Sequence, residues 1–137
     1  MRRLAVIPAR GGSKRIPRKN IRDFLGRPII AYSIEAALGS GMFDEVMVST
    51  DDGEIAQVAL AHGASVPFLR SGEASDDHAT TAQVLEEVLE RYEEQGKTFD
   101  CACCLYPTAP FVTGETLKQG YSRLNDGGYD TVFPVLR

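Results

Sequence analysis

The sequence predicts an α/β protein of three layers, in which a mostly parallel sheet lies between two layers of helices. Two observations predict this fold. Short apolar runs alternate along the chain with segments whose apolar residues recur at the helical period, and the connections between these segments are short. A β-α-β-α order of this kind places helices on both faces of a parallel sheet, with right-handed crossovers. The length of 137 residues suits a single compact domain.

The expected strands share an apolar character. The first apolar run is too short for a signal peptide and leads directly into a glycine-rich loop, so it is expected to be a strand. The run that contains Pro67 makes a poor strand, because proline lacks the N–H that a ladder needs. The run that contains the cysteines is apolar throughout, as in a buried parallel strand. The expected strands cover residues 4–7, 45–50, 65–69, 101–105 and 131–135.

The expected helices have recognisable first or last residues. Pro28 suits the start of the first helix, and Gly39 and Gly41 suit its end. Asp51-Asp52 can cap the second helix, which is expected to stop at Gly63. The longest helix has apolar residues at the 3.6-residue period. The expected helices cover residues 28–38, 54–62, 80–95 and 115–124.

The fold class predicts that a ligand binds at one edge of the sheet. In open parallel sheets, ligands bind beyond the carboxyl ends of the strands. This rule brings Ala9, Thr50-Asp51, Arg70 and Tyr106-Pro107 to the same edge. The chain contains no linker, repeat or low-complexity segment.

The basic residues gather at the start of the chain. Residues 1–27 contain nine Lys or Arg and one acidic residue, Asp23, whereas the other 110 contain six basic and eighteen acidic residues, so the balances are +8 and −12. Nucleic-acid binding usually needs a broad basic face, which argues against nucleic acid as a partner. A local site for phosphates fits this charge pattern, and a solvated basic loop is the alternative.

Three cysteines lie close together, at Cys101, Cys103 and Cys104. An odd number without a wider framework indicates reduced thiols and a cytoplasmic protein. Alternation along a strand sends Cys104 to the opposite face from the other two, which disfavours a metal site formed by all three. The chain has no run of 18 or more apolar residues, so no membrane span is expected.

The loop over residues 8–20, PARGGSKRIPRKN, carries the main chemical signal. Its two adjacent glycines let the backbone approach a ligand closely, and successive N–H groups in such a turn can form an anion nest. Arg10, Lys14 and Lys19 add positive charge. The spacings of the Walker A motif and of the dinucleotide fingerprint are both absent. A loop of this kind after a strand predicts phosphate binding.

The same loop resembles the signature of acylneuraminate cytidylyltransferases. The related 3-deoxy-manno-octulosonate enzymes have a similar opening but typically Pro-Gly-Lys-Pro in place of residues 17–20. The similarity continues through VSTDD at 48–52, SDDHATT at 75–81 and LYPTAP at 105–110. The sialic acid branch normally has Gln where this chain has Tyr106. The chain is therefore most similar to the pseudaminic acid branch, whose product feeds flagellin glycosylation in bacteria.

The resemblance implies a Rossmann-like nucleotide-diphospho-sugar transferase fold that is incomplete at its C-terminal side. Residues 1–137 would be the nucleotide-binding portion of a single cytidylyltransferase domain. The implied reaction is attack of the anomeric hydroxyl of a nonulosonic acid on the α-phosphate of CTP, with release of pyrophosphate. Positioning and cations carry such a reaction. Arg10 and Lys14 are the implied catalytic residues, with Lys14 stabilising the transition state.

The implied nucleotide-binding residues lie in two loops and at the start of the longest helix: Ala9, Arg10, Gly11, Gly12, Ser13, Lys14, Lys19, Asn20, Arg70, Asp77, Ala79, Thr80 and Thr81. Among them, Ser13 would donate to a phosphate oxygen and Arg70 would reach the cytosine ring. Asp77 or Thr80 is also suited to cap the helix, and both roles are compatible because a helix N-terminus is a polar ligand site. The implied sugar-binding residues are Tyr106, Pro107 and Thr108.

The resemblance also implies Mg²⁺ as cofactor, with its aspartate ligands beyond residue 137. Asp51-Asp52 is expected to cap a helix rather than bind a metal, and Asp76-Asp77 is an alternative metal pair. Much of the sugar pocket and the dimerisation segment is expected beyond residue 137 as well. The full-length protein would then be a homodimer with no nucleic-acid or membrane partner, and these 137 residues alone would lack full activity.

Two other functions stay open at this point. One is a sialic acid cytidylyltransferase, from which Tyr106 distinguishes the pseudaminic acid branch. The other is a domain that binds a nucleotide without turnover, because a fold by itself does not imply catalysis.

Overall fold

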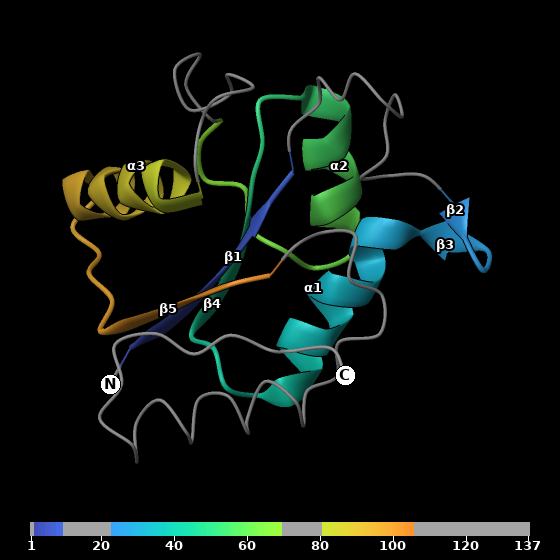
Figure 1. Cartoon of the computed structure of the whole chain (residues 1–137), viewed down its shortest axis with the longest axis horizontal. Coiled ribbons are helices and arrows are strands. Elements are labelled where there is room, and N and C mark those ends of the chain that lie inside the picture. The colour runs from blue at the N-terminus through green and yellow to red at the C-terminus, as the bar shows by residue number, and fades with distance from the viewer. Residues whose placement is uncertain (1, 10–22, 70–80, 106–137) are drawn as a thin grey trace.

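The computed structural model describes residues 2–9, 23–69 and 81–105 (Figure 1). Within these residues the main sheet is parallel and has the strand order β4-β1-β5. Its strands are β1 (Arg3–Pro8), β4 (Glu45–Ser49) and β5 (Cys101–Cys104). β1 pairs with β4 from Leu4↔Glu45 to Pro8↔Ser49, and with β5 from Arg3↔Cys101 to Val6↔Cys104.

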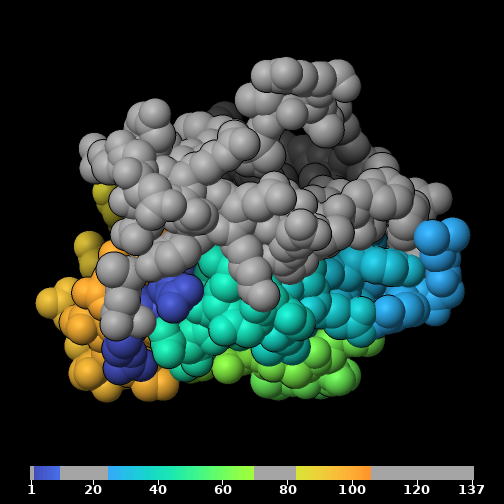
Figure 2. Space-filling model, turned by 90° about the horizontal axis from the view of Figure 1, so that it is seen from below, coloured from blue at the N-terminus to red at the C-terminus, as the bar shows by residue number. Residues whose placement is uncertain are grey.

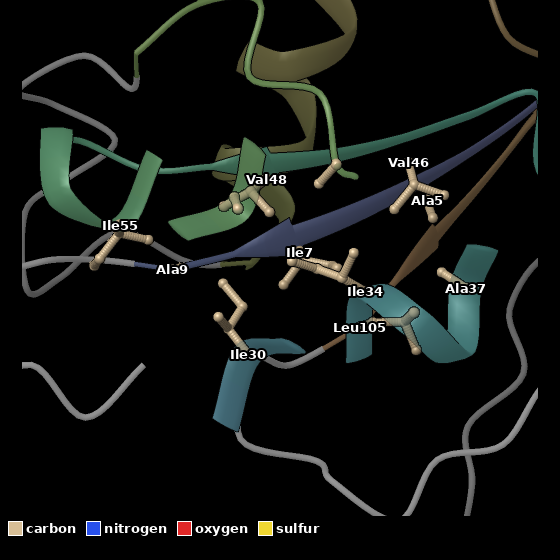
Figure 3. Close-up of a cluster of buried hydrophobic side chains, with 12 residues drawn as sticks. Ala5, Ile7, Ala9, Ile30, Ile34, Ala37, Val46, Val48, Ile55 and Leu105 are labelled. Atoms are coloured by element: carbon tan, nitrogen blue, oxygen red, sulfur yellow. The ribbon is translucent and has the colours of Figure 1, made fainter. Parts of the chain in front are cut away.

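Helices cover both faces of this sheet, because alternate residues of β1 face opposite cores. Ala5, Ile7 and Ala9 pack with α1 (Ile29–Ser40) and α2 (Gly53–Ala61). Leu4 and Val6 pack with α3 (Thr81–Glu94) on the other face. Figure 3 shows Ile7 of β1 facing Ile30 and Ile34 of α1 in the first core. The predicted three-layer α/β fold is confirmed.

The predicted helix ends agree with the structure to within one or two residues. Pro28 is the N-cap of α1, and Gly41 ends it in the left-handed conformation at φ 68°, with its N–H donating to the Leu38 carbonyl. Asp52 caps α2, as expected: its Oδ1 accepts hydrogen bonds from the N–H groups of Glu54 at 2.8 Å and Ile55 at 3.2 Å. The turn after α2 has Gly63 at φ 98°.

A short hairpin precedes α1 and was not predicted. Its strands are β2 (Asp23–Phe24) and β3 (Arg27–Pro28), joined by Leu25 at φ 53° and Gly26 at φ 87°. Positive φ at both loop residues is the geometry of a two-residue hairpin, for which Asn-Gly or Asp-Gly is the usual sequence. Gly26 was the available signal. The hairpin was not predicted from Gly26 because Leu25 stands where Asn or Asp is usual, and because each strand has only two residues.

The hairpin is held against α1 by Arg27. This side chain forms an ion pair with Glu35, and its guanidinium carbon lies 5.3 Å from the ring centroid of Tyr32. Figure 2 shows α1 and the hairpin as one continuous surface on this side of the molecule. The start of α1 is therefore fixed by the hairpin as well as by the core.

Two strand predictions need correction. Residues 65–69 form no strand beyond a single parallel bridge between Ser65 and Met47. Pro67 has no N–H to continue the ladder. The cysteine strand is only half-buried in the described structure, with Ala102 exposed, because β5 has no described neighbour on its outer side. The expected strand at 131–135 and helix at 115–124 lie outside the described residues.

The three cysteines are free. Burial raises the pKa of Cys103 to about 11, with Cys104 and Cys101 adding to the effect, and burial also raises the pKa of Cys104. A raised pKa lowers the fraction of each thiol that is in the reactive thiolate form at neutral pH. Among the described residues, no three or more His, Cys, Asp or Glu side chains gather to hold a metal ion. That part of the chain also has no helix with the length and apolarity to cross a membrane.

An aromatic cluster joins α3 to the sheet. Tyr92 of α3 is fully buried. Its ring centroid lies 5.4 Å from that of Phe68 and 5.2 Å from that of Phe99, and both pairs pack edge to face. Its hydroxyl is buried without a hydrogen-bond partner among the described residues. Burial raises the pKa of Tyr92, and the Glu45 carboxylate raises it further. The Glu45 carboxylate therefore lies close to the hydroxyl, although the two form no well-aligned hydrogen bond, and the ring packing is the larger contact of this side chain.

Replacing Tyr92 by Phe should lower the free energy of unfolding by no more than about 1 kcal/mol, because the buried hydroxyl makes no well-formed hydrogen bond and loses only its approach to the Glu45 carboxylate. Replacing Tyr92 by Ala should cost roughly 3–5 kcal/mol, because it empties the space between Phe68 and Phe99. Equilibrium unfolding in urea measures both changes. A loss above about 2 kcal/mol in the Phe variant would show that the hydroxyl is bonded after all.

Candidate functional site

The carboxyl ends of the three strands lie side by side at one edge of the sheet. Beyond β1, the N–H of Ala9 donates to the Ser49 carbonyl of β4 at 2.8 Å. Beyond β5, the N–H of Leu105 donates to the Val6 carbonyl of β1 at 2.9 Å. These bonds extend the ladder by one residue past each strand, so the chain leaves the sheet at neighbouring points. We call Ala9, Thr50 and Leu105 the strand-end residues.

The strand-end residues are buried, with exposed fractions of 0%, 0% and 6%. Ala9 belongs to the predicted nucleotide-binding set, and its side chain lies in the core with α1 and α2. Its N–H is used in the sheet. Ala9 therefore anchors the start of the segment that continues with Arg10, and its own role in nucleotide binding stays a prediction.

Thr50 and Asp52 form a rigid turn at the end of β4. Thr50 Oγ1 accepts a hydrogen bond from the Asp52 N–H at 3.1 Å, and Asp52 Oδ1 in turn caps α2. Oδ1 of the Asp52 carboxylate thus accepts from two backbone N–H groups at the start of α2. This geometry confirms the prediction that Asp52 caps a helix. Asp51, beside it, is exposed.

The third part of the predicted site begins at α3. Thr81, another predicted nucleotide-binding residue, is the first residue of this helix. The segment that enters residues 70–80 ends at Leu69, which is half exposed. Leu69 and Thr81 are thus the described ends of the loop that the sequence assigns to the cytosine ring.

The remaining predicted site residues lie outside the described residues, and their roles stay predictions. They belong to the basic loop, the loop before α3 and the segment after β5: Arg10, Gly11, Gly12, Ser13, Lys14, Lys19, Asn20, Arg70, Asp76, Asp77, Ala79, Thr80, Tyr106, Pro107 and Thr108. The described structure supplies the points from which these three segments leave the fold. Two of those points, Ala9 and Leu105, are joined to β4 and β1 by backbone hydrogen bonds.

The described charged residues near the carboxyl end of β4 are acidic. Asp51, Asp52 and Glu54 are acidic residues at the end of β4 and the start of α2. On the other face of the sheet, α3 exposes Glu86, Glu90, Glu93 and Glu94. The prediction that phosphate binds beyond the strands therefore depends on the cations that the sequence places after Ala9.

The sequence matches the Cytidylyltransferase family over residues 4–136. It is 54% identical to the pseudaminic acid cytidylyltransferase of Campylobacter jejuni over 123 residues, which cover 90% of this chain and 53% of the relative. It is 46% identical to the CMP-N,N'-diacetyllegionaminic acid synthase of Legionella pneumophila over 118 residues, 86% of this chain and 51% of the relative. The chain thus spans about half the length of these relatives.

Solved structures show the same fold. CMP:2-keto-3-deoxy-manno-octonic acid synthetase complexed with CTP superposes with a TM-score of 0.77 at 28% identity, over 93% of this chain and 49% of that one. The 4-diphosphocytidyl-2C-methyl-D-erythritol synthase of Anaerococcus prevotii gives 0.63 at 15% identity, over 90% of this chain and 51% of that one, which shows the fold alone. Because the family match covers nearly all of its residues, the chain belongs to the cytidylyltransferase family.

Proposed function

We propose that the protein is an enzyme that transfers CMP from CTP to a nonulosonic acid, pseudaminic acid in the first place, and releases pyrophosphate. The observation that carries this proposal is the 54% identity to the Campylobacter jejuni pseudaminic acid cytidylyltransferase over 90% of the chain. The Legionella pneumophila relative is named for another sugar of this class, which supports the class of acceptor more broadly.

The described edge of the sheet supports a phosphate site at the basic loop. Ala9 is fixed by its bond to Ser49, so the loop leaves the carboxyl end of the central strand, where ligands of parallel sheets bind. Arg10 and Lys14 would hold the triphosphate from this loop. As the bond from the sugar oxygen to the α-phosphorus forms and the bond to pyrophosphate breaks, negative charge grows on the phosphate oxygens. Lys14 would stabilise that charge.

The choice of pseudaminic acid rests on the segment after β5. Leu105 is tied to β1, so Tyr106, the next residue, follows a fixed point at the edge of the sheet. We propose that Tyr106, Pro107 and Thr108 contact the sugar, and that Tyr106 distinguishes this enzyme from sialic acid cytidylyltransferases. Delivery of the product to flagellin glycosylation is part of the same proposal.

We further propose that the reaction needs Mg²⁺, because a triphosphate substrate normally carries this ion. The described residues offer no donor set for it: Asp52 is committed to capping α2, and no group of three or more suitable side chains is present among them. A homodimeric assembly rests on the family resemblance, and a cytoplasmic location is supported by the three free cysteines.

Pyrophosphate release by the complete gene product tests the function. With CTP and Mg²⁺, we expect kcat/KM to be at least about tenfold higher with pseudaminic acid than with N-acetylneuraminic acid, because a pocket that pairs with one sugar's polar groups rejects the other. UTP and ATP should be poor donors, and EDTA should stop the reaction. A preference for N-acetylneuraminic acid would favour the sialic acid alternative. CTP binding without turnover of any nonulosonic acid would favour a non-catalytic domain.

Lys14→Ala should lower kcat by roughly 10²–10³ with little change in the KM for the sugar, because it removes a charge that acts mainly in the transition state. Lys97→Ala is the matched control: Lys97 pairs with Glu45 at 3.2 Å at the opposite edge of the sheet, far from the strand-end residues. Its kcat should stay near wild type. An unchanged kcat in Lys14→Ala would remove Lys14 from the catalytic role.

A further inference from the structure

Two aspartates lie at the amino end of the sheet, one in front of each strand that pairs with β1. Asp44 directly precedes β4 and Asp100 directly precedes β5, so both lie at the edge opposite the strand-end residues. In Figure 1, the three strands start at the same end of the sheet. Strand ends usually fray, because their outermost N–H and C=O groups have no further ladder partner. The two aspartates supply partners for those groups of β1.

Asp44 forms a closed pair of hydrogen bonds with Arg3 of β1. Its N–H donates to the Arg3 carbonyl at 2.9 Å, and its Oδ2 accepts from the Arg3 N–H at 2.7 Å. In a parallel ladder, the second bond would normally end on a backbone carbonyl of the partner strand. The carboxylate oxygen takes the place of that carbonyl, so Asp44 continues the β1–β4 ladder by one bond beyond the strand.

Asp100 repeats this arrangement on the other side of β1, with Arg2. Its N–H donates to the Arg2 carbonyl at 2.8 Å, and its Oδ2 accepts from the Arg2 N–H at 2.7 Å. The Cys101 N–H also reaches the Arg2 carbonyl, at 3.3 Å. The first two described residues of the chain are therefore bonded in opposite directions, Arg2 toward β5 and Arg3 toward β4.

The two pairs share one peptide group, the one between Arg2 and Arg3. Its carbonyl belongs to Arg2 and accepts on the β5 side, whereas its N–H belongs to Arg3 and donates on the β4 side. A peptide group is planar and rigid, so its carbonyl cannot move without its N–H. Hydrogen bonds at the two ends of one amide also polarise each other. Loss of either pair should therefore loosen the other.

We propose that Asp44 and Asp100 form one cooperative clamp, which holds the start of the central strand on both sides. With the clamp closed, β1 opens together with the rest of the sheet instead of fraying from its first residues. Two independent caps would show the same hydrogen bonds, but each would protect only its own side of β1. The inference concerns the fold and holds whether or not the protein transfers CMP.

Amide hydrogen exchange in variants of the complete gene product separates these two cases. Asp44→Ala removes an acceptor on the β4 side and should speed exchange of the Cys101 amide, on the β5 side, about three- to tenfold, as expected for the loss of one hydrogen bond. Asp100→Ala should speed exchange of the Asp44 amide by a similar factor. Each rate is compared with that of the Ile34 amide in the buried part of α1, which reports a general loss of stability.

Glu86→Ala is the matched control, because it removes an exposed carboxylate from α3 that lies outside the clamp. It should leave both rates near wild type. Asp44→Asn and Asp100→Asn keep a side-chain oxygen that can accept, so they should show the same pattern with smaller increases. Faster exchange confined to the side of the substituted aspartate, relative to Ile34, would overturn the inference.

The asparagine variants also decide the question if an alanine variant does not fold. A rise in exchange on the opposite side of β1 in these variants would support the clamp, and an unchanged rate on that side would overturn it.

Discussion

The burial of β1 at the centre of the sheet is the constraint on which the rest of the structure depends. Leu4, Ala5, Val6 and Ile7 are completely buried, and successive residues belong to opposite cores. The backbone of β1 pairs with a strand on each side. A strand in this position needs helices on both faces, and its end is fixed by hydrogen bonds from both neighbours. The loop that follows Ala9 therefore starts from a buried residue that is hydrogen-bonded to β4.

The separation between core and charge follows from this arrangement. Beyond the strands, the described edge of the sheet consists of the buried strand-end residues and the start of α2, which Asp52 caps. Cations that could meet a triphosphate are supplied by the sequence directly after the buried strand, in the segment that starts with Arg10. Buried strand ends of this kind favour preorganised binding of a triphosphate, because they do not need to rearrange when the phosphates bind.

The sequence was sufficient to predict the parts of the fold with strong periodicity. β1, β4, β5 and the three described helices were predicted because their apolar residues repeat with the period of a buried strand or an amphipathic helix. The β2–β3 hairpin was missed because Leu25 occupies a position that usually carries Asn or Asp. The run at 65–69 resembled a strand by composition, but its hydrogen bonding stops at Ser65.

The candidate site and its surroundings also contain features that the sequence predicts and contacts that it does not. The basic loop was predicted from its glycines and cations, which are local features of the sequence. The contact between Arg91 and the Leu69 carbonyl joins residues 22 positions apart and involves a backbone acceptor, so no sequence pattern announces it. Arg91 occupies an ordinary polar position near the end of an amphipathic helix. Contacts of this kind depend on how elements pack, and only the three-dimensional arrangement shows them.

The proposed nucleotide site lies at the carboxyl edge formed by β1, β4 and β5. Titration of the ¹⁵N-labelled complete gene product with CTP, followed by amide chemical shifts, tests it most directly. The amides of the strand-end residues Ala9, Thr50 and Leu105 should shift, while those of Arg3, Glu45 and Cys101 at the opposite edge should stay unchanged. Shifts confined to the opposite edge, or no shifts at the strand-end residues at saturating CTP, would contradict the account.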